Sequence, residues 1–209
     1  MRNLHALKEI ARAVRLDVLD LTAGPGGHVS SSFSAVEILT SIYFGGVMRY
    51  RAGQPDWPER DRFILSKGHA APAFYPVLAR AGYLPFELLA GFRKPGTGLH
   101  GHPIAGALPG VEMTSGSLGQ GLSFGLGCVL AGRLSGLAFR AFVLLGDGEC
   151  EEGQIWEAAM AAAHWKADNL TAIIDHNKYC ILYTSDAADD LLRLELAGRR
   201  IINQKPQTN

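Results

Sequence analysis

The 209 residues suit one domain or one and a half, and 20 basic side chains balance 20 acidic ones. With 47% hydrophobic and 19% charged residues the composition is that of an ordinary globular chain. A zero net charge offers no basic surface for nucleic acid, and no apolar run is long enough to span a membrane, so we expect neither partner. The three cysteines have no CxxC spacing, which argues against a disulfide framework or zinc site. Without a signal-peptide pattern at the N-terminus, we expect a cytoplasmic protein.

Two helices are predicted in the first 45 residues. Apolar residues recur every three or four positions over residues 4–21, which predicts an amphipathic helix that stops at Gly24. Ser34 and Glu37 have the spacing of a capping box in front of the apolar residues 38–43. We therefore expect the second helix to begin at Ser34.

The middle of the chain predicts a short strand and two further helices. Residues 62–65 form an apolar run typical of a buried strand. Pro72 suits the first turn of a helix that ends near Gly82. Residues 118–134 are apolar and rich in small side chains, which indicates a buried helix packed closely against its neighbours.

The segment from residue 140 to residue 179 is typical of a strand, helix, strand unit. The strands are predicted at residues 141–145 and 170–174, with a helix over residues 151–165 between them. A connection of this length makes the strands parallel, so their carboxyl ends lie at one edge of the sheet, where ligands of open α/β sheets bind. Asp147 follows the first strand and Asn177 follows the second. We therefore expect an α/β fold with a mostly parallel sheet, in which these two side chains meet.

This pair suits a magnesium ion that holds a diphosphate, because Mg²⁺ prefers oxygen ligands in a tight octahedron. Asp147 would contribute a carboxylate, Asn177 its amide oxygen and Tyr179 its backbone carbonyl, with diphosphate oxygens and water completing six ligands. Gly146 and Gly148 would allow the backbone to approach the phosphates, at the start of the next helix. The Gly-Asp-Gly turn alone is weak support, since it also suits a simple tight turn. The asparagine thirty positions later makes the pattern specific.

The same residues resemble the fingerprint shared by transketolases, pyruvate decarboxylases and 2-oxoacid dehydrogenases, which use thiamine diphosphate. Four further segments resemble the N-terminal part of transketolases in the same order: GPGGH at residues 24–28, SKGHA at 66–70, GHP at 101–103 and TSGSLGQG at 114–121. The sequence GDGECEEGQIWEAAMAAAHW, residues 146–165, is most similar to transketolases whose two halves are separate polypeptides. The resemblance covers about residues 5–180.

The resemblance implies a three-layer α/β/α thiamine-diphosphate-binding fold and a role for each matching residue. It implies Mg²⁺, or Ca²⁺ or Mn²⁺ in its place, bound by Asp147, Asn177 and the Tyr179 carbonyl. It implies cofactor contacts from His69, Gly116, Leu118, Gly148, Glu149 and Asn177. Catalytic roles are implied for His28, His69 and His102 around the reacting carbon, and for Glu152, which would face the partner chain. His100, two residues before His102, is either a second substrate contact or an extra loop residue.

By the same resemblance the chain is part of an enzyme that transfers a two-carbon ketol group between sugar phosphates. The family also needs a pyrimidine-binding domain carrying an activating glutamate, and no segment of this chain resembles it. We therefore expect the chain to be inactive alone and to require a C-terminal transketolase subunit or domain, in a dimer or heterotetramer. The alternatives are a deoxyxylulose phosphate synthase or dihydroxyacetone synthase, or an inactive cofactor-binding fragment or scaffold.

The last part of the chain departs from the family pattern. We expect residues 1–180 to form the diphosphate-binding domain, incomplete at its C-terminus. Residues 181–209 include LYTSDAADD, which resembles a translated sequencing adaptor. We expect this tail to be an artefact or disordered; the alternative is a divergent tail with a short helix over residues 191–196.

Overall fold

The structure is a computed structural model that describes residues 3–176. Its α-helices are α1 (Leu4–Thr22), α2 (Val29–Phe44), α3 (Ala71–Ala81), α4 (Gln120–Leu134) and α5 (Gly153–His164). Its strands are β1 (Arg62–Leu65), β2 (Ala141–Gly146) and β3 (Leu170–Asp175), and three short 3-10 helices are η1 (Gly68–Ala70), η2 (Phe86–Gly91) and η3 (Gly148–Glu151). The predictions for Asn177, Tyr179 and residues 181–209 lie outside the described residues.

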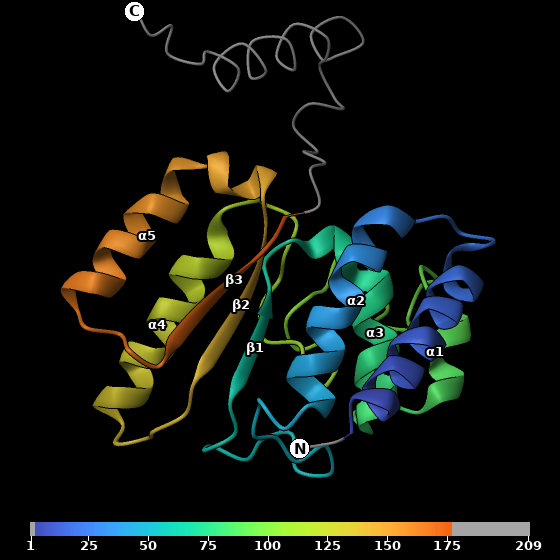
Figure 1. Ribbon diagram of the computed structural model, residues 1–209, viewed down its shortest axis with the longest axis horizontal. Coiled ribbons are helices and arrows are strands. Elements are labelled where there is room, and N and C mark those ends of the chain that lie inside the picture. Colours follow the sequence, from blue (N-terminus) through green and yellow to red (C-terminus); the bar gives the residue numbers. More distant parts are fainter. Residues whose placement is uncertain (1–2, 177–209) are drawn as a thin grey trace, which may run out of the picture.

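The three strands form a parallel sheet in the order β1, β2, β3 (Figure 1). Arg62 of β1 pairs with Ala141 of β2, and Gly146 at the end of β2 pairs with Asp175 at the end of β3. The predicted parallel unit is therefore confirmed, and all three strands end at the same edge. Helix α3 also matches its prediction, since Pro72 lies in its first turn and Gly82 ends it in the left-handed conformation.

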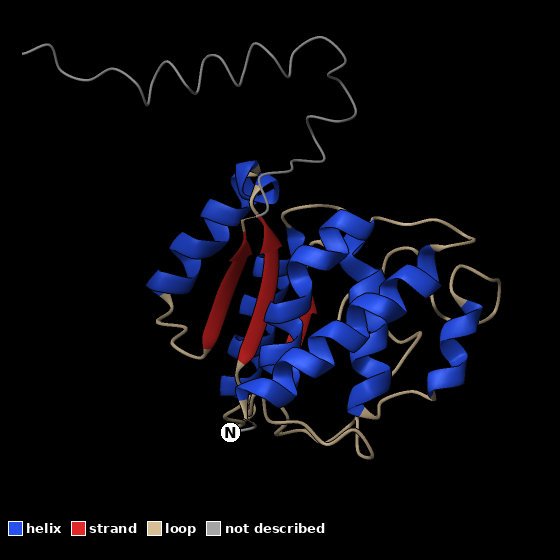
Figure 2. Ribbon diagram, turned by 45° about the vertical axis from the view of Figure 1, so that its right-hand side comes forward, coloured by secondary structure: helices blue, strands red, loops and turns tan. Residues whose placement is uncertain are grey.

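Helices cover both faces of the sheet (Figures 1 and 2). Because strand side chains alternate between the faces, Phe142 and Leu144 of β2 pack on the side of α1, α2 and α3. Val143 and Leu145 pack on the side of α4 and α5. All six residues of β2 are buried. This is the expected three-layer α/β/α arrangement, with the central strand shielded from water on both faces.

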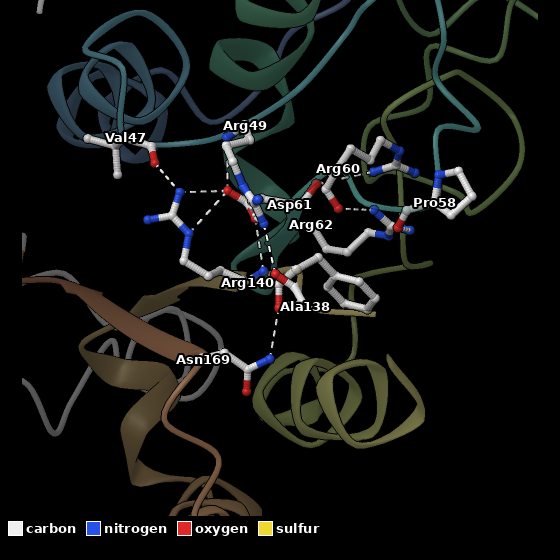
Figure 3. Close-up of polar contacts among 10 residues, drawn as sticks. Val47, Arg49, Pro58, Arg60, Asp61, Arg62, Ala138, Arg140 and Asn169 are labelled. Atoms are coloured by element: carbon white, nitrogen blue, oxygen red, sulfur yellow. Dashed lines mark hydrogen bonds and ion pairs between the residues drawn. The ribbon is translucent and has the colours of Figure 1, made fainter. Parts of the chain in front are cut away.

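A buried carboxylate holds the amino ends of β1 and β2 together (Figure 3). The Asp61 side chain, fully buried, accepts hydrogen bonds from the backbone amides of Arg49 at 2.8 Å and Arg140 at 2.9 Å. Their guanidinium groups also donate to it, at 3.1 Å from Arg49 Nη2 and 2.7 Å from Arg140 Nη2. Burial alone would raise the pKa of Asp61, but these hydrogen bonds outweigh it and lower the pKa below the usual value.

Two predicted helix starts are wrong. Helix α2 begins at Val29, with His28 at its N-cap, so the Ser34 and Glu37 capping box does not exist. The Ser34 hydroxyl instead donates to Asp175 Oδ2 at 2.6 Å, a residue 141 positions away. Residues 148–151 form the short helix η3, and α5 begins only at Gly153. Within residues 3–176, none of the helices is both long and apolar enough to cross a membrane.

Candidate functional site

The carboxyl edge of the sheet brings together the turns that follow β2 and β3. Asp147 leaves β2 with its backbone N–H directed at the Asp175 carbonyl, at 3.3 Å. Its carboxylate oxygen Oδ1 accepts from the Gly148 amide at 3.1 Å, at the start of η3. Asp175 ends β3 two residues before Asn177. The predicted meeting of the two strand exits is thus present in the described residues, although Asn177 itself lies beyond them.

Glu149, a predicted cofactor contact, holds three segments of the site in place. Its carboxylate, only 3% exposed, accepts from the Gly119 amide at 2.8 Å and from the Gly146 amide at 3.0 Å. The Ser66 hydroxyl donates to the same carboxylate. Glu149 therefore joins the end of β1, the start of α4 and the end of β2, and its buried carboxylate is stabilised by hydrogen bonds from all three segments.

The N-terminus of α4 approaches Ser66 so closely that residue 121 has to be glycine. The Gly121 amide donates to Ser66 Oγ at 3.1 Å, and a Cβ on Gly121 would lie 3.0 Å from the Ser66 Cα. We expect Gly121→Ala to lower the free energy of unfolding by about 1–3 kcal/mol, because neither backbone can move away. Urea denaturation of the purified chain measures this effect.

Gly127, on the same helix, is the matched control for this prediction. It is exposed, and a Cβ there would meet no atom within 4 Å. Gly127→Ala should therefore raise the free energy of unfolding by about 0.5–1 kcal/mol through helix propensity. Equal effects of the two alanines would contradict the close approach at Ser66.

Three predicted histidines gather at the same edge. The His28 and His69 rings lie 5.6 Å apart between centroids and are nearly perpendicular, at 73°. His102 faces Gly116, where a Cβ would lie 3.8 Å from the His102 ring. Gly116 has φ +134°, a conformation that favours glycine. The structure thus brings His28, His69, His102 and Gly116 together from four separate sequence segments.

The surroundings of His69 and His102 keep these two side chains uncharged. Burial, followed by the charge of Lys67, lowers the pKa of His69 to about 3. Burial also lowers the pKa of His102, helped by the neighbouring His28 and Arg93. Near neutral pH both rings therefore offer one N–H donor and one nitrogen acceptor, which suits hydrogen bonding to hydroxyl and phosphate groups.

Hydrogen bonds between loops fix the position of His102. The buried Tyr75 hydroxyl of α3 donates to the His100 carbonyl at 2.8 Å. On the other side, the Ser115 amide donates to the Pro103 carbonyl at 3.0 Å. His100 thus contacts Tyr75 through its backbone carbonyl and not through its imidazole. Tyr75 and Ser115 hold the loop that carries His102 from both sides.

A cavity of about 290 Å³ opens beside the histidines. Its lining includes His28, His102, Phe92 and Arg93. Arg93 has φ +59°, uncommon for a residue with a side chain, and its Nη1 donates to the Pro25 carbonyl at 3.0 Å. Arg93 therefore adds a fixed positive charge to the cavity, and no sequence pattern singled this residue out.

The other predicted residues lie around the same edge. Glu152 packs against Gly119, where a Cβ would lie 2.9 Å from the Glu152 Cβ. Leu118 precedes α4 and is half-buried, and Gly148 is buried at the start of η3. From α5, the Trp156 indole donates to the Cys150 carbonyl at 2.9 Å.

A diphosphate fits the residues at this edge. The Ser115 hydroxyl is buried and has no hydrogen-bond partner among the described residues. Gly68 leaves no room for a Cβ against Ser115, which keeps this hydroxyl beside Gly116 and the histidines. Within residues 3–176, no three His, Cys, Asp or Glu side chains could hold a metal ion by themselves. A metal at Asp147 would therefore depend on further oxygen ligands, such as those of a diphosphate.

Comparison with known proteins agrees with this geometry. The family model described as "Transketolase, thiamine diphosphate binding domain" matches residues 6–193. The chain is 47% identical over 152 residues to the 6-deoxy-6-sulfo-D-fructose transketolase subunit SqwG of Clostridium sp. (strain MSTE9), covering 73% of this chain and 55% of the relative. It is 44% identical over 174 residues to an apulose-4-phosphate transketolase subunit of Actinobacillus succinogenes, covering 82% and 63%. Human transketolase is 42% identical over 179 residues, covering 85% and 28%.

Comparison with solved structures also finds transketolases. Transketolase from Campylobacter jejuni superposes with a TM-score of 0.81 at 29% identity, covering 94% of this chain and 33% of that one. Transketolase from Leishmania mexicana gives a TM-score of 0.74 at 33% identity, covering 80% and 27%. The chain thus spans between 27% and 63% of the length of the proteins named here. With its fold, its Gly-Asp-Gly turn and its family match in agreement, the chain belongs to the thiamine diphosphate-binding domains of the transketolase family.

Proposed function

We propose that this chain is the diphosphate-binding part of a transketolase that moves a two-carbon ketol group between sugar phosphates. The observation that supports the proposal is that Asp147, at the exit of β2, and His69, just after β1, lie at one edge of the parallel sheet, with the His28 ring beside His69. When bound, thiamine diphosphate supplies the nucleophilic carbon for ketol transfer, and the chain supplies binding and orientation.

The metal ion is held, in this proposal, by Asp147, Asn177 and the Tyr179 carbonyl, with Mg²⁺ as the physiological ion and Ca²⁺ or Mn²⁺ as substitutes. The cofactor is held by His69, Gly116, Leu118, Gly148, Glu149 and Asn177. Glu149 acts here through Gly119 and Gly146, whose amides it binds. In this proposal Glu149 therefore acts on the cofactor by positioning the backbone of Gly119 and Gly146.

The sugar phosphate lies, in this proposal, in the cavity lined by His28 and His102. The neutral His102 imidazole hydrogen-bonds hydroxyl groups of the sugar, and Arg93 supplies positive charge at the same cavity. Residues 1–180 form this domain. The free thiols Cys128 and Cys150 suit the reducing cytoplasm, where we place the protein.

The partner is a C-terminal transketolase subunit or domain with the pyrimidine-binding glutamate, and Glu152 faces it. Two relatives whose names identify them as transketolase subunits, from Clostridium and Actinobacillus, support a separate partner chain. The complete enzyme is then a dimer or heterotetramer. The named relatives are transketolases, so the deoxyxylulose phosphate synthase and dihydroxyacetone synthase alternatives are not favoured.

The test is cofactor binding by the Asp147→Ala variant. Wild-type protein should bind thiamine diphosphate only when Mg²⁺ is present, and Asp147→Ala should raise the Kd at least about tenfold because the metal loses a carboxylate ligand. Isothermal titration calorimetry with and without Mg²⁺ measures both effects.

Asp168→Ala is the matched control. Asp168 lies before β3, at the opposite end of the sheet, with its side chain 94% exposed. Its removal should leave the Kd unchanged. Thiamine diphosphate binding that does not depend on Mg²⁺, or a Kd that is unchanged in Asp147→Ala, would contradict the proposed metal site and favour a scaffold role.

A further inference from the structure

A buried ion pair crosses the sheet beneath the turn that carries Asp147. The Lys67 side chain has no exposed surface, and its Nζ lies 2.5 Å from Asp175 Oδ2. Ser34 Oγ donates to the same oxygen at 2.6 Å. Lys67 follows β1 and Asp175 ends β3, so the pair spans the central strand β2. A Cβ on Gly146, the last residue of β2, would lie 3.9 Å from the Lys67 Cβ.

Stability alone is a poor explanation for this pair. Removing two charges from water carries a large desolvation penalty, and well-packed apolar side chains in place of a buried ion pair often stabilise a protein as well or better. What an ion pair with a short hydrogen bond adds is a defined direction and distance between its partners. Lys67 and Asp175 therefore constrain where the strand ends lie.

The pair connects the segments that build the proposed site. Ser34 belongs to α2, which begins directly after His28. Lys67 is followed two residues later by His69. The Asp175 carbonyl accepts the Asp147 amide at 3.3 Å. The segments that carry His28 and His69 are thus both bonded to the Asp175 carboxylate. The backbone carbonyl of Asp175 in turn accepts the hydrogen bond from Asp147.

We propose that Lys67 is a positioning residue for the metal and diphosphate site: with Ser34 it fixes Asp175, and Asp175 fixes the turn that carries Asp147. This inference rests on the proposed function. It assigns Lys67 no contact with the cofactor. Its effect reaches the ligand through Asp175, in the way that outer hydrogen-bonded partners orient metal ligands.

The test uses the double variant Lys67→Met/Asp175→Asn in the full-length protein. Either single change leaves one buried charge without its partner and endangers folding, whereas the double change removes both charges and introduces uncharged side chains of similar size. We expect a Tm within a few degrees of wild type but a Kd for thiamine diphosphate, at saturating Mg²⁺, raised about 10- to 100-fold. Calorimetric titration and thermal unfolding supply the two readings.

Arg80→Met/Asp17→Asn is the matched control, because it removes an ion pair with an Nε to Oδ2 distance of 2.6 Å between α3 and α1. It should change the Tm without changing the Kd. Equal Kd values for wild type and the Lys67→Met/Asp175→Asn variant would overturn the inference but leave the proposed function intact. Wild-type protein without Mg²⁺-dependent binding would overturn both.

Ser34→Ala serves as a milder variant, decisive if the double variant does not fold. It keeps the ion pair and removes one hydrogen bond to Asp175. The expected result is a Kd raised about two- to tenfold with a nearly unchanged Tm. An unchanged Kd in Ser34→Ala would contradict a positioning role for this group of residues.

Discussion

Glu149→Ala is expected to lower the free energy of unfolding by about 2–6 kcal/mol. The change leaves the buried Gly119 and Gly146 amides without their acceptor, at about 1–3 kcal/mol for each unsatisfied group. The Ser66 hydroxyl loses the same acceptor. Urea denaturation followed by circular dichroism gives the value, provided that wild type and variant have the same slope with denaturant.

Glu157→Ala is the control for Glu149, since Glu157 is exposed on α5. Its effect should stay within about 0.5 kcal/mol. Glu149→Gln refines the test, because one end of its amide can still accept while the other must face a backbone N–H. The free energy of unfolding of Glu149→Gln should lie between the values of wild type and Glu149→Ala. A Glu149→Ala effect as small as that of Glu157→Ala would show that Glu149 does not hold these segments.

The second large effect is expected at the opposite edge of the sheet. Asp61→Ala should lower the free energy of unfolding at pH 7 by about 3 kcal/mol, the lower end of the range for breaking a buried ion pair. The lower end applies because the Arg49 and Arg140 side chains are 50% and 43% exposed, so water screens part of the interaction. Urea denaturation measures this difference as well.

The pH dependence identifies the cause of the Asp61 effect. The pKa of Asp61 is lower in the folded state than in the unfolded state, so its ionisation stabilises the fold above about pH 4. This contribution is lost as the pH falls through the folded pKa. The difference between wild type and Asp61→Ala should therefore shrink below about pH 4. Asp56→Ala, an exposed change in the same loop, should show no such trend.

Local sequence patterns predicted the elements whose formation depends on local residues. The amphipathic spacing of residues 4–21 matches α1, and Pro72 with Gly82 marks both ends of α3. The prediction that the strands before Asp147 and Asn177 are parallel is confirmed, and parallel strands end at one edge of the sheet. These inferences needed only backbone geometry and the periodicity of side chains.

Contacts between distant residues decided what the sequence could not predict. The capping-box prediction failed because α2 begins at Val29, which places Ser34 inside the helix, where its hydroxyl donates to Asp175 Oδ2, 141 positions away. Lys67 lies within the SKGHA segment at residues 66–70, yet that segment alone does not predict an ion pair with Asp175, 108 positions away. The Ser115 hydroxyl is buried and has no hydrogen-bond partner among the described residues, which no sequence pattern indicates.

The hydrogen bond between Trp156 and Cys150 gives the molecule a built-in optical reporter. The chain has three tryptophans, and Trp156 is the one bonded to the turn that follows Asp147. Trp57 stacks against Arg51, and Trp165 ends α5. With Trp57 and Trp165 changed to phenylalanine, the tryptophan fluorescence would come from Trp156 alone. Its emission would then report on the turn that follows Asp147, without any attached dye.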